Sequence, residues 1–217
     1  KLDHIQTQFW RTSNLNFHTP ISLIKSLEEK PQVDWLRKIN ECEDEKALKY
    51  FLKHQKIFNS EFDKKNLMLL WECCQIPDFV KKTYGHHLEV VDKVFNFLTG
   101  EESKIPNYYM KKQLSMLDKL DGNVDSISNR ISNVRTWSYV ANKKNWVENS
   151  DYWIHLTKSI EDKLSDRLHN ELTKSFIDKK ISILSRSLKQ DLVLNTEIND
   201  ENKIHIDGQL VGELKGL

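Results

Sequence analysis

Residues 69–79 read LLWECCQIPDF, and this stretch marks a junction between two predicted helices. The apolar side chains before the proline predict a buried helix face made of Leu69, Leu70, Trp71 and Cys74. Pro77 lacks the amide hydrogen that a continuing helix needs, so we expect the helix to end or kink there. Asp78 follows, and an acid in the first turn favours the next helix because it compensates the positive end of the helix dipole. The stretch therefore predicts packed helices separated by short breaks.

The rest of the N-terminal half shows the same alternation of helical spacing and short breaks. The chain of 217 residues holds only six glycines and four prolines, and its apolar residues recur at helical spacing, which favours an all-α fold. Thr19 and Pro20 suit the N-cap and first position of a helix, and Gly100 suits a helix end. The predicted helices cover residues 20–29, 32–41, 44–55, 61–75, 77–98 and 106–120.

Two longer helices are predicted beyond the break at residues 121–123. One face of the first carries Val124, Ile127, Ile131, Val134, Ser138 and Ala141. After a loop over residues 142–149, the helical pattern extends over residues 151–190, which would be about 60 Å if straight. Its apolar stripe turns by about 100° between residues 153–168 and 177–188. Either the helix breaks near residues 170–180, or it buries different sides against different neighbours.

The tail changes its period from helix to strand. Residues 203–206 and 210–214 flank Asp207-Gly208, which predicts a β hairpin, and residues 192–198 could add a third strand. We therefore predict an all-α, multi-helix region with a small C-terminal β hairpin. Its parts would be residues 1–121, 122–190 and 191–217. The start without methionine and the abrupt end lead us to expect a piece of a longer protein.

The composition predicts a folded chain with no general attraction to nucleic acid or membrane. Hydrophobic residues make up 38% of the chain and aromatic residues 10%, enough for a sizeable core. Lysine and arginine total 33 against 32 acids, so any attraction to a polyanion must be local. Residues 122–190 carry 12 basic and 8 acidic groups, and residues 191–217 carry 2 and 6. Three cysteines and the lack of an apolar run of about 20 residues predict a reducing compartment and no membrane span.

The common motifs of catalysis and cofactor binding are missing from the sequence. It contains no G-x-x-x-x-G-K-[ST] or G-x-G-x-x-G loop, no H-E-x-x-H helix and no G-x-S-x-G turn. His86, His87 and His169 lack metal-ligand spacing to the cysteines. Adjacent acids such as Glu161 and Asp162 do not face each other on a helix. We therefore predict no catalytic residue, no cofactor site and no metal site within this chain.

A positive functional signal comes from a basic and aromatic stretch, residues 123–147. Against the single acid Asp125 it carries four cations and three large rings: Arg130, Arg135, Lys143 and Lys144, with Trp137, Tyr139 and Trp146. Phosphates need cations and unstacked bases need aromatic surfaces, so the stretch suits single-stranded nucleic acid. We predict contacts from the four cations and Trp137. The alternative is that Trp137 and Tyr139 are edges of the core and that the arginines form ion pairs within the domain.

Several segments, in the same order, resemble the C-terminal region of the mitochondrial degradosome RNA helicase family of the suppressor-of-Var type. The resemblance is greatest to the α-proteobacterial superfamily-two members. The similar segments are residues 10–17 (WRTSNLNF), 69–79, 121–125 (DGNVD), 135–137 (RTW), 140–142 (VAN), 160–169 (IEDKLSDRLH) and the terminal 206–216.

The resemblance implies a helical accessory region of an ATP-dependent helicase that acts on RNA or DNA. In that family two RecA-like lobes bind ATP and magnesium and drive translocation, and none of their motifs matches this sequence, so no catalytic residue carries over. The implied partners are single-stranded nucleic acid, the RecA-like lobes of the same protein and an exoribonuclease. The implied location is the bacterial cytoplasm or the mitochondrial matrix. The alternative is a protein-interaction scaffold that docks the helicase to a nuclease or another partner.

Overall fold

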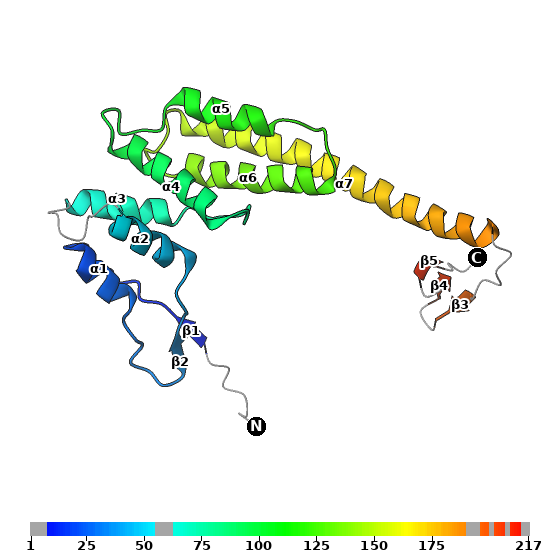
Figure 1. Cartoon of the computed structure of the whole chain (residues 1–217), viewed down its shortest axis with the longest axis horizontal. Coiled ribbons are helices and arrows are strands. Elements are labelled where there is room, and N and C mark those ends of the chain that lie inside the picture. Colours follow the sequence, from blue (N-terminus) through cyan, green and yellow to red (C-terminus); the bar gives the residue numbers. More distant parts are fainter. Residues whose placement is uncertain (1–7, 55–62, 190–195, 200–201, 207–208, 214–217) are drawn as a thin grey trace. The chain divides into compact units, whose positions relative to one another are not determined.

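A computed structural model describes residues 8–54, 63–189, 196–199, 202–206 and 209–213, and Figure 1 shows their elements. These residues form seven helices and five short strands, which confirms a mostly helical fold with a small C-terminal sheet. The helices are α1 (Pro20–Leu27), α2 (Glu43–His54), α3 (Lys64–Cys74), α4 (Tyr84–Thr99), α5 (Asn107–Leu117), α6 (Val124–Asn142) and α7 (Ser150–Lys189). The strands are β1 (Gln8–Trp10), β2 (Leu36–Lys38), β3 (Thr196–Ile198), β4 (Lys203–Ile206) and β5 (Gln209–Glu213).

The chain divides into two compact units. The first comprises Lys1–Lys119 and Asn129–Asp162, and the second comprises Leu120–Ser128 and Lys163–Leu217. The helices α6 and α7 each begin in one unit and end in the other. The three-part division expected from the sequence stays a prediction. No helix among the described residues is both long enough and apolar enough to cross a membrane.

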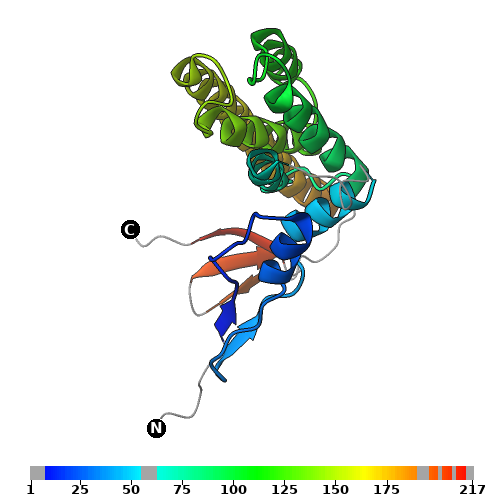
Figure 2. The same ribbon diagram turned by 90° about the vertical axis from the view of Figure 1, so that its left-hand side faces the viewer.

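In the first unit, local capping starts α1 where the sequence predicted it. The Thr19 hydroxyl accepts from the Ser22 amide at 3.1 Å, and the Ser22 hydroxyl accepts from the Thr19 amide at 2.9 Å, a reciprocal capping box. Helix α2 packs against α1 and α3, and α3 also packs against α4 (Figures 1 and 2). Their fully buried leucines include Leu23, Leu48, Leu52, Leu67 and Leu70. The helices predicted near residues 20–29, 44–55 and 61–75 are confirmed within the bounds given above, and residues 55–62 lie outside the described residues.

The helix predicted over residues 32–41 was wrong, because these residues carry β2. Strand β1 pairs in parallel with β2, with Gln8 opposite Leu36 and Trp10 opposite Lys38. The amide of Ile39 donates to the Trp10 carbonyl at 2.9 Å and extends the pairing. The partner strand lies on the other side of α1 in the sequence, so local spacing could not reveal it.

Arg11 ties the end of β1 to α2 and α3. Its Nη1 donates to Asp44 Oδ2 at 2.8 Å, its Nη2 lies 3.5 Å from Glu45 Oε1, and its guanidinium lies 5.2 Å from the centroid of the Trp71 ring. The Glu45 side chain is only 1% exposed. Burial raises the pKa of this carboxyl, while the charge of Arg11 opposes that rise. The contact brings together two stretches singled out in the sequence, the one after β1 and the one at the end of α3.

The junction at Pro77 is a loop and not an immediate restart of the helix. Helix α3 ends before the proline, as predicted, but α4 begins only at Tyr84, where the Thr83 hydroxyl caps the first turn. Asp78 stabilises the loop instead of a helix start, since its Oδ1 accepts from the Lys81 amide at 2.9 Å. The predicted start of the second helix was therefore wrong, whereas its predicted end near residue 98 is confirmed.

The parts of α5, α6 and α7 that belong to the first unit lie side by side (Figure 1). The Tyr109 ring of α5 lies 4.8 Å from the Phe97 ring of α4 and 5.7 Å from the Trp137 ring of α6. The Thr136 hydroxyl of α6 donates to the Pro77 carbonyl at 3.2 Å. Helix α6 therefore packs both against the aromatic cluster and against the loop that follows α3.

Helix α7 continues without a break over 40 residues, so the first of the two alternatives, a break near residues 170–180, is wrong. The first apolar stripe is buried at Trp153, Ile160 and Leu164. Further along, the apolar side chains are exposed by 48% to 57%: Leu172, Phe176, Ile177 and Ile181. The second predicted stripe is thus exposed at Ile177 and Ile181, and the side chains of Leu184 and Leu188 lie outside the described residues.

The second unit contains an antiparallel sheet in the order β3-β4-β5, seen in Figure 2. Ile198 of β3 lies opposite Ile204, and Lys203 of β4 lies opposite Glu213. The predicted hairpin is confirmed as β4 and β5, and the third strand is present as β3. The predicted turn at Asp207-Gly208 lies outside the described residues.

Candidate nucleic-acid interface

All five predicted contact residues lie in the first unit. Arg130, Arg135 and Trp137 are in α6, and Lys143 and Lys144 are in the turn after it. The structure does not gather them in one place. Arg130 and Lys143 are about 20 Å apart along the helix axis, because each residue advances a helix by about 1.5 Å. Each predicted residue therefore has its own surroundings.

Trp137 is a core residue in this structure. Its side chain is only 4% exposed, and its ring meets the Tyr109 ring edge-on at 5.7 Å. A base could stack on the indole only if α5 moved away from α6. The direct contact predicted for Trp137 therefore does not fit this geometry, and the alternative interpretation, a core-edge tryptophan, describes it.

Arg130 joins α6 to the chain that leaves α5. Its Nη1 donates to the Lys119 carbonyl at 2.7 Å, and its side chain is half-buried. A charged donor on a backbone carbonyl makes one of the stronger protein hydrogen bonds. This bond holds the start of the first-unit part of α6 close to the end of α5, so Arg130 has a clear structural role.

Arg135 forms an ion pair at the surface with α7. Its Nε lies 2.7 Å from Glu161 Oε1, with the arginine side chain 52% exposed and the glutamate 26% exposed. Exposed pairs of this kind contribute about 0–1 kcal/mol to stability. A guanidinium has five N–H donors, and this contact engages Nε. A phosphate could therefore compete with or join Glu161 at little energetic cost.

Lys143 lies between two aromatic rings just after the end of α6. Its Nζ is 5.1 Å from the centroid of the Tyr139 ring and 5.7 Å from that of the Trp146 ring, within the range of cation–π attraction. Asn145 supplies the left-handed residue of the turn, with φ of 65°, a conformation that asparagine tolerates better than most residues. The turn brings Trp146 back towards Lys143, and the Trp146 amide donates to the Lys143 carbonyl at 3.4 Å.

These neighbours define one continuous surface, which we call the α6 end surface. Arg135 and Tyr139 are four residues apart, so they are adjacent on the same helix face. Lys143 contacts Tyr139, and the next residue, Lys144, is exposed. The surface thus consists of Arg135, Tyr139, Lys143 and Lys144, and it offers three cations around a half-buried phenol ring.

The two cysteines of α3 are buried, and the charge of Lys143 acts on one of them. Cys73 and Cys74 of α3 are 0% and 2% exposed. Burial raises the pKa of the Cys73 thiol, with the charge of Lys143 opposing the rise, and burial also raises the pKa of the Cys74 thiol. A raised pKa keeps a thiol protonated and weakly nucleophilic. Among the described residues no group of three or more His, Cys, Asp or Glu side chains could hold a metal ion.

Some of this site was outside the reach of sequence patterns. The sequence pattern places Tyr139 among the aromatic residues of the stretch without predicting a contact for it, and it gives Glu161 no partner. The i, i+4 spacing of Arg135 and Tyr139 was the signal that could have joined them. The pairing of Arg135 with Glu161 depends on how α6 packs against α7, and no local sequence pattern predicts that packing.

Comparisons with protein-family models, with curated proteins and with solved structures found no match for this chain. Cations that surround an aromatic ring can attract phosphates and can stack a base, and these are the two needs of single-strand binding.

Proposed function

We propose that this chain is the helical accessory region of an ATP-dependent helicase that acts on RNA or DNA. In this proposal it braces the two RecA-like lobes of the parent protein and guides a single strand across the α6 end surface. The sequence resemblance, spread over nearly the whole chain, supports the parentage. The observation that carries the strand-guiding role is Lys143, held between the Tyr139 and Trp146 rings beside the exposed Lys144.

The proposed contacts follow from charge and ring geometry. Lys143 and Lys144 attract neighbouring phosphates, and release of the counterions around those phosphates drives binding. Arg135 turns part of its guanidinium from Glu161 to a phosphate, which is feasible because an exposed ion pair is weak. A base stacks on the accessible part of Tyr139, where stacking is tolerant of sequence. The strand would move when ATP-driven motion of the RecA-like lobes, which bind ATP and magnesium in the resembled family, pulls it past these contacts.

Arg130 and Trp137 have a bracing role in this proposal and do not contact the strand. Arg130 fixes α6 to the end of α5 through the Lys119 carbonyl, and Trp137 fixes it through Tyr109. Together they keep the α6 end surface at a constant position in the first unit. An arginine-to-alanine change at residue 130 would then weaken binding only through loss of folding stability.

The test measures strand binding at several salt concentrations, using the fluorescence anisotropy of a labelled single-stranded oligonucleotide. The test variant is Lys143→Gln with Lys144→Gln. The matched control is Lys111→Gln with Lys112→Gln, which removes the same charge from two exposed lysines of α5. Each phosphate contact contributes about 0.7 to the slope of log affinity against log salt for single strands. We expect the test variant to lower the slope by about 1.4 and the control to leave it unchanged.

Two outcomes would refute the strand-guiding role. One is the absence of salt-sensitive binding by the unmodified chain. The other is an equal change of slope in the test and control variants, which would mean that only net charge matters. Circular dichroism of each variant shows whether a loss of binding reflects a loss of fold.

A second candidate function is a protein-interaction scaffold that docks the helicase to an exoribonuclease or another partner. The observation that favours it is the row of exposed apolar side chains on α7: Leu172, Phe176, Ile177 and Ile181. Its test is sedimentation of the chain mixed with a purified exoribonuclease from the same organism. Leu172→Lys with Ile181→Lys should abolish a complex formed through α7, while strand binding stays unchanged.

A further inference from the structure

Strands β1 and β2, which lie side by side in Figure 1, form a parallel sheet whose two faces differ in exposure. Side chains alternate between the faces along each strand, and directly paired residues share a face. Trp10 of β1 and its partner Lys38 are half-buried. Phe9 and its partner Arg37 are exposed, and Phe9 is 73% exposed. One face is therefore open to solvent, although parallel sheets are usually covered on both faces.

Trp35 precedes β2 directly and extends the exposed face. It is 48% exposed, Leu36 after it is half-buried, and Arg37 is exposed again, so the alternation of the strand includes it. Two bonds fix the backbone on either side of its ring. The Gln8 amide donates to the Trp35 carbonyl at 3.4 Å, and the Leu36 amide donates to the Val33 carbonyl at 3.0 Å and closes a turn. We call Phe9, Trp35 and Arg37 together the β1–β2 open face.

The three side chains of this face have no partners within the described part of the chain. Arg37 makes no hydrogen bond or ion pair there, whereas Arg11 and Arg135 are paired with acids. The Phe9 and Trp35 rings contact no other ring and no cation there. Single exposed apolar residues are common on protein surfaces. Here two open rings flank one cation whose five N–H donors are unused, and such a grouping indicates a binding surface.

The spacing of these groups suits a single strand of nucleic acid. Trp35 lies about 6.6 Å from Arg37 along the chain, because each strand residue advances by about 3.3 Å. Phe9 lies across the sheet, one strand spacing of about 4.8 Å away. A guanidinium binds a phosphate through two parallel hydrogen bonds, and every base has a face that can stack on a ring. A phosphate on Arg37 would thus have its neighbouring bases within reach of both rings.

A protein partner fits this face less well than a strand does. A specific protein interface usually involves about 20–30 residues on each side, and this face offers three side chains. A single strand needs only a cation for a phosphate and a ring for a base. Asp34, which precedes Trp35, is exposed as well, and its charge would repel a phosphate. We therefore expect the phosphate at Arg37 and the bases on the rings beside it.

We propose that the β1–β2 open face is a second binding site for single-stranded nucleic acid. Arg37 binds a phosphate, and bases stack on Trp35 and Phe9. The site shares no residue with the α6 end surface, so it does not depend on the proposed strand-guiding role of that surface.

Trp35 gives the proposed site a fluorescence signal of its own. The chain has six tryptophans. Trp10 is half-buried on the other face of the sheet, and the remaining four are at most 5% exposed: Trp71, Trp137, Trp146 and Trp153. A base that stacks on an exposed indole quenches its emission. Quenching by a single strand therefore reports on Trp35.

The experiment titrates the full chain with a short single-stranded oligouridylate. Tryptophan emission reports stacking, and the anisotropy of a label on the strand reports affinity. We expect quenching in the unmodified chain. Trp35→Phe should remove the quenching and keep most of the affinity, because phenylalanine still offers a ring. Trp35→Leu and Phe9→Leu should each weaken binding about tenfold, and Arg37→Gln should lower the slope of log affinity against log salt by about 0.7.

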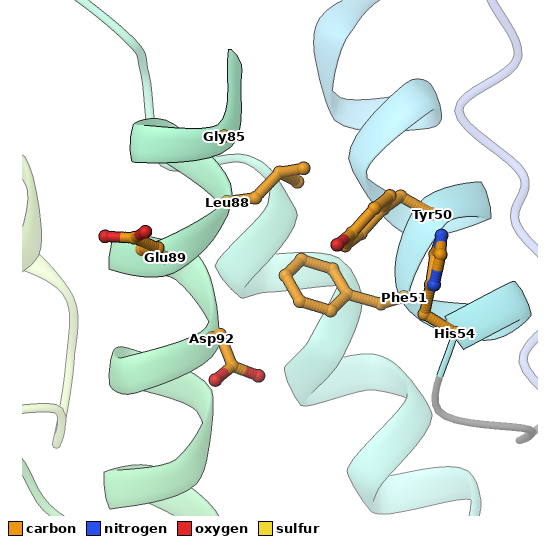
Figure 3. Close-up of a pocket in the computed structure, with 7 residues that line it drawn as sticks. All are labelled: Tyr50, Phe51, His54, Gly85, Leu88, Glu89 and Asp92. Atoms are coloured by element: carbon orange, nitrogen blue, oxygen red, sulfur yellow. The ribbon is translucent and has the colours of Figure 1, made fainter. Parts of the chain in front are cut away.

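Tyr50→Leu is the matched control for removal of an exposed ring. Tyr50 of α2 lines a groove of about 400 Å³ that Glu89 and Asp92 also line (Figure 3), and carboxylates disfavour a phosphate. This variant should leave the affinity and the salt slope unchanged. A duplex of the same length is the ligand control, because its bases are already stacked on one another and should quench Trp35 little.

The proposal is overturned if the strand does not quench the unmodified chain, if Trp35→Phe is quenched as strongly as the unmodified chain, or if the duplex quenches as strongly as the single strand. It is also overturned if Phe9→Leu binds as well as Tyr50→Leu does. Circular dichroism shows whether each variant is folded.

One further variant separates this site from the α6 end surface. Lys143→Gln with Lys144→Gln should keep the quenching of Trp35 at saturating strand concentration, and loss of that quenching would overturn the proposal. If the quenching depends on Trp35 while the lysine variant leaves the salt slope unchanged, the β1–β2 open face binds the strand and the strand-guiding role of the α6 end surface fails.

Discussion

Replacing Arg11 by methionine should destabilise the first unit strongly at neutral pH and much less in acid. Methionine keeps an apolar stem of similar length over Trp71, so the change removes chiefly the guanidinium. What remains is Glu45, whose side chain is only 1% exposed, without the cation 3.5 Å away. Among the described residues Glu45 Oε1 and Arg11 Nη2 have no hydrogen-bond partner, so their mutual attraction is the main compensation for burying the charge.

The expected magnitude follows from how deeply the two groups are buried. Removing one partner of a fully buried ion pair costs about 3–5 kcal/mol. Arg11 is 28% exposed, so the lower end of that range, about 3 kcal/mol, applies at about pH 7. Loss of the cation–π contact with Trp71 adds about 0.5–1 kcal/mol. Urea unfolding monitored by circular dichroism measures the difference in the free energy of unfolding between the variant and the unmodified chain.

The loss of stability in Arg11→Met should also change with pH in a definite direction. Burial raises the pKa of Glu45 in the folded chain, and Arg11 is the main charge that opposes this rise, so Arg11→Met raises the pKa further. A carboxyl with a raised folded pKa stabilises the fold below its unfolded pKa, and that contribution is lost as pH rises through the folded pKa. The deficit of Arg11→Met should therefore shrink as pH falls from about 7 towards 4.5, the ordinary value.

The control is Glu45→Gln, which removes the charge and keeps the shape. In the Arg11→Met background, Glu45→Gln should restore most of the lost stability at neutral pH, which a double-mutant cycle would show as a coupling energy. A deficit of less than about 1 kcal/mol, or one that stays constant with pH, would mean that Arg11 does not compensate the buried charge, and the reasoning would fail.

Three further predictions concern the same unit. Thr136→Val removes the hydroxyl that donates to the Pro77 carbonyl and should lower the free energy of unfolding by about 1 kcal/mol, measured by urea unfolding; a change near zero would contradict it. Burial lowers the pKa of His87, so its contribution to stability is present above its unfolded pKa and lost as pH falls through the folded value. His87→Gln should therefore reduce the acid-side decline of stability by about 1 kcal/mol between about pH 7 and 5, and an unchanged decline would count against it. With a thiol reagent Cys42, which is partly exposed, should react first, and the two buried cysteines should react only after unfolding; three equal rates would refute the buried positions.

Much of the fold could be predicted because helical spacing and capping are local. The capping box at Thr19, the end of α3 before Pro77 and the hairpin of β4 and β5 all depend on residues close together in the sequence. The parallel pairing of β1 with β2 depends on residues that α1 separates, so the apolar spacing of residues 32–41 suggested helix. The late start of α4 had a similar cause, because Asp78 can serve either a helix start or a loop and only the observed bond to Lys81 distinguishes them.

The candidate site shows the same limit at the level of single residues. A helical wheel places Trp137 at the border of the apolar face of α6, but it does not say whether another helix covers that border. Tyr109 of α5 covers it. The wheel also leaves Arg135 without a partner, and Glu161 of α7 supplies one. Whether a residue at the border of an apolar helix face is buried in the core or stays exposed for contacts depends on which helices from elsewhere in the chain pack against it.

The proposal also predicts a link between packing at the Pro77 loop and strand binding at the α6 end surface, through the rigidity of one helix. Thr136 anchors α6 to the loop after α3, and Arg135 and Tyr139 flank that anchor on the helix. Loosening the anchor would let the α6 end surface move as a body, without changing any of its cations. A variant such as Thr136→Val should therefore weaken strand affinity while leaving the salt slope intact, because the slope counts phosphate contacts and the affinity also depends on how well they are held in place. Under the proposed function, the stretch at residues 69–79 would thus contribute through the position it gives α6.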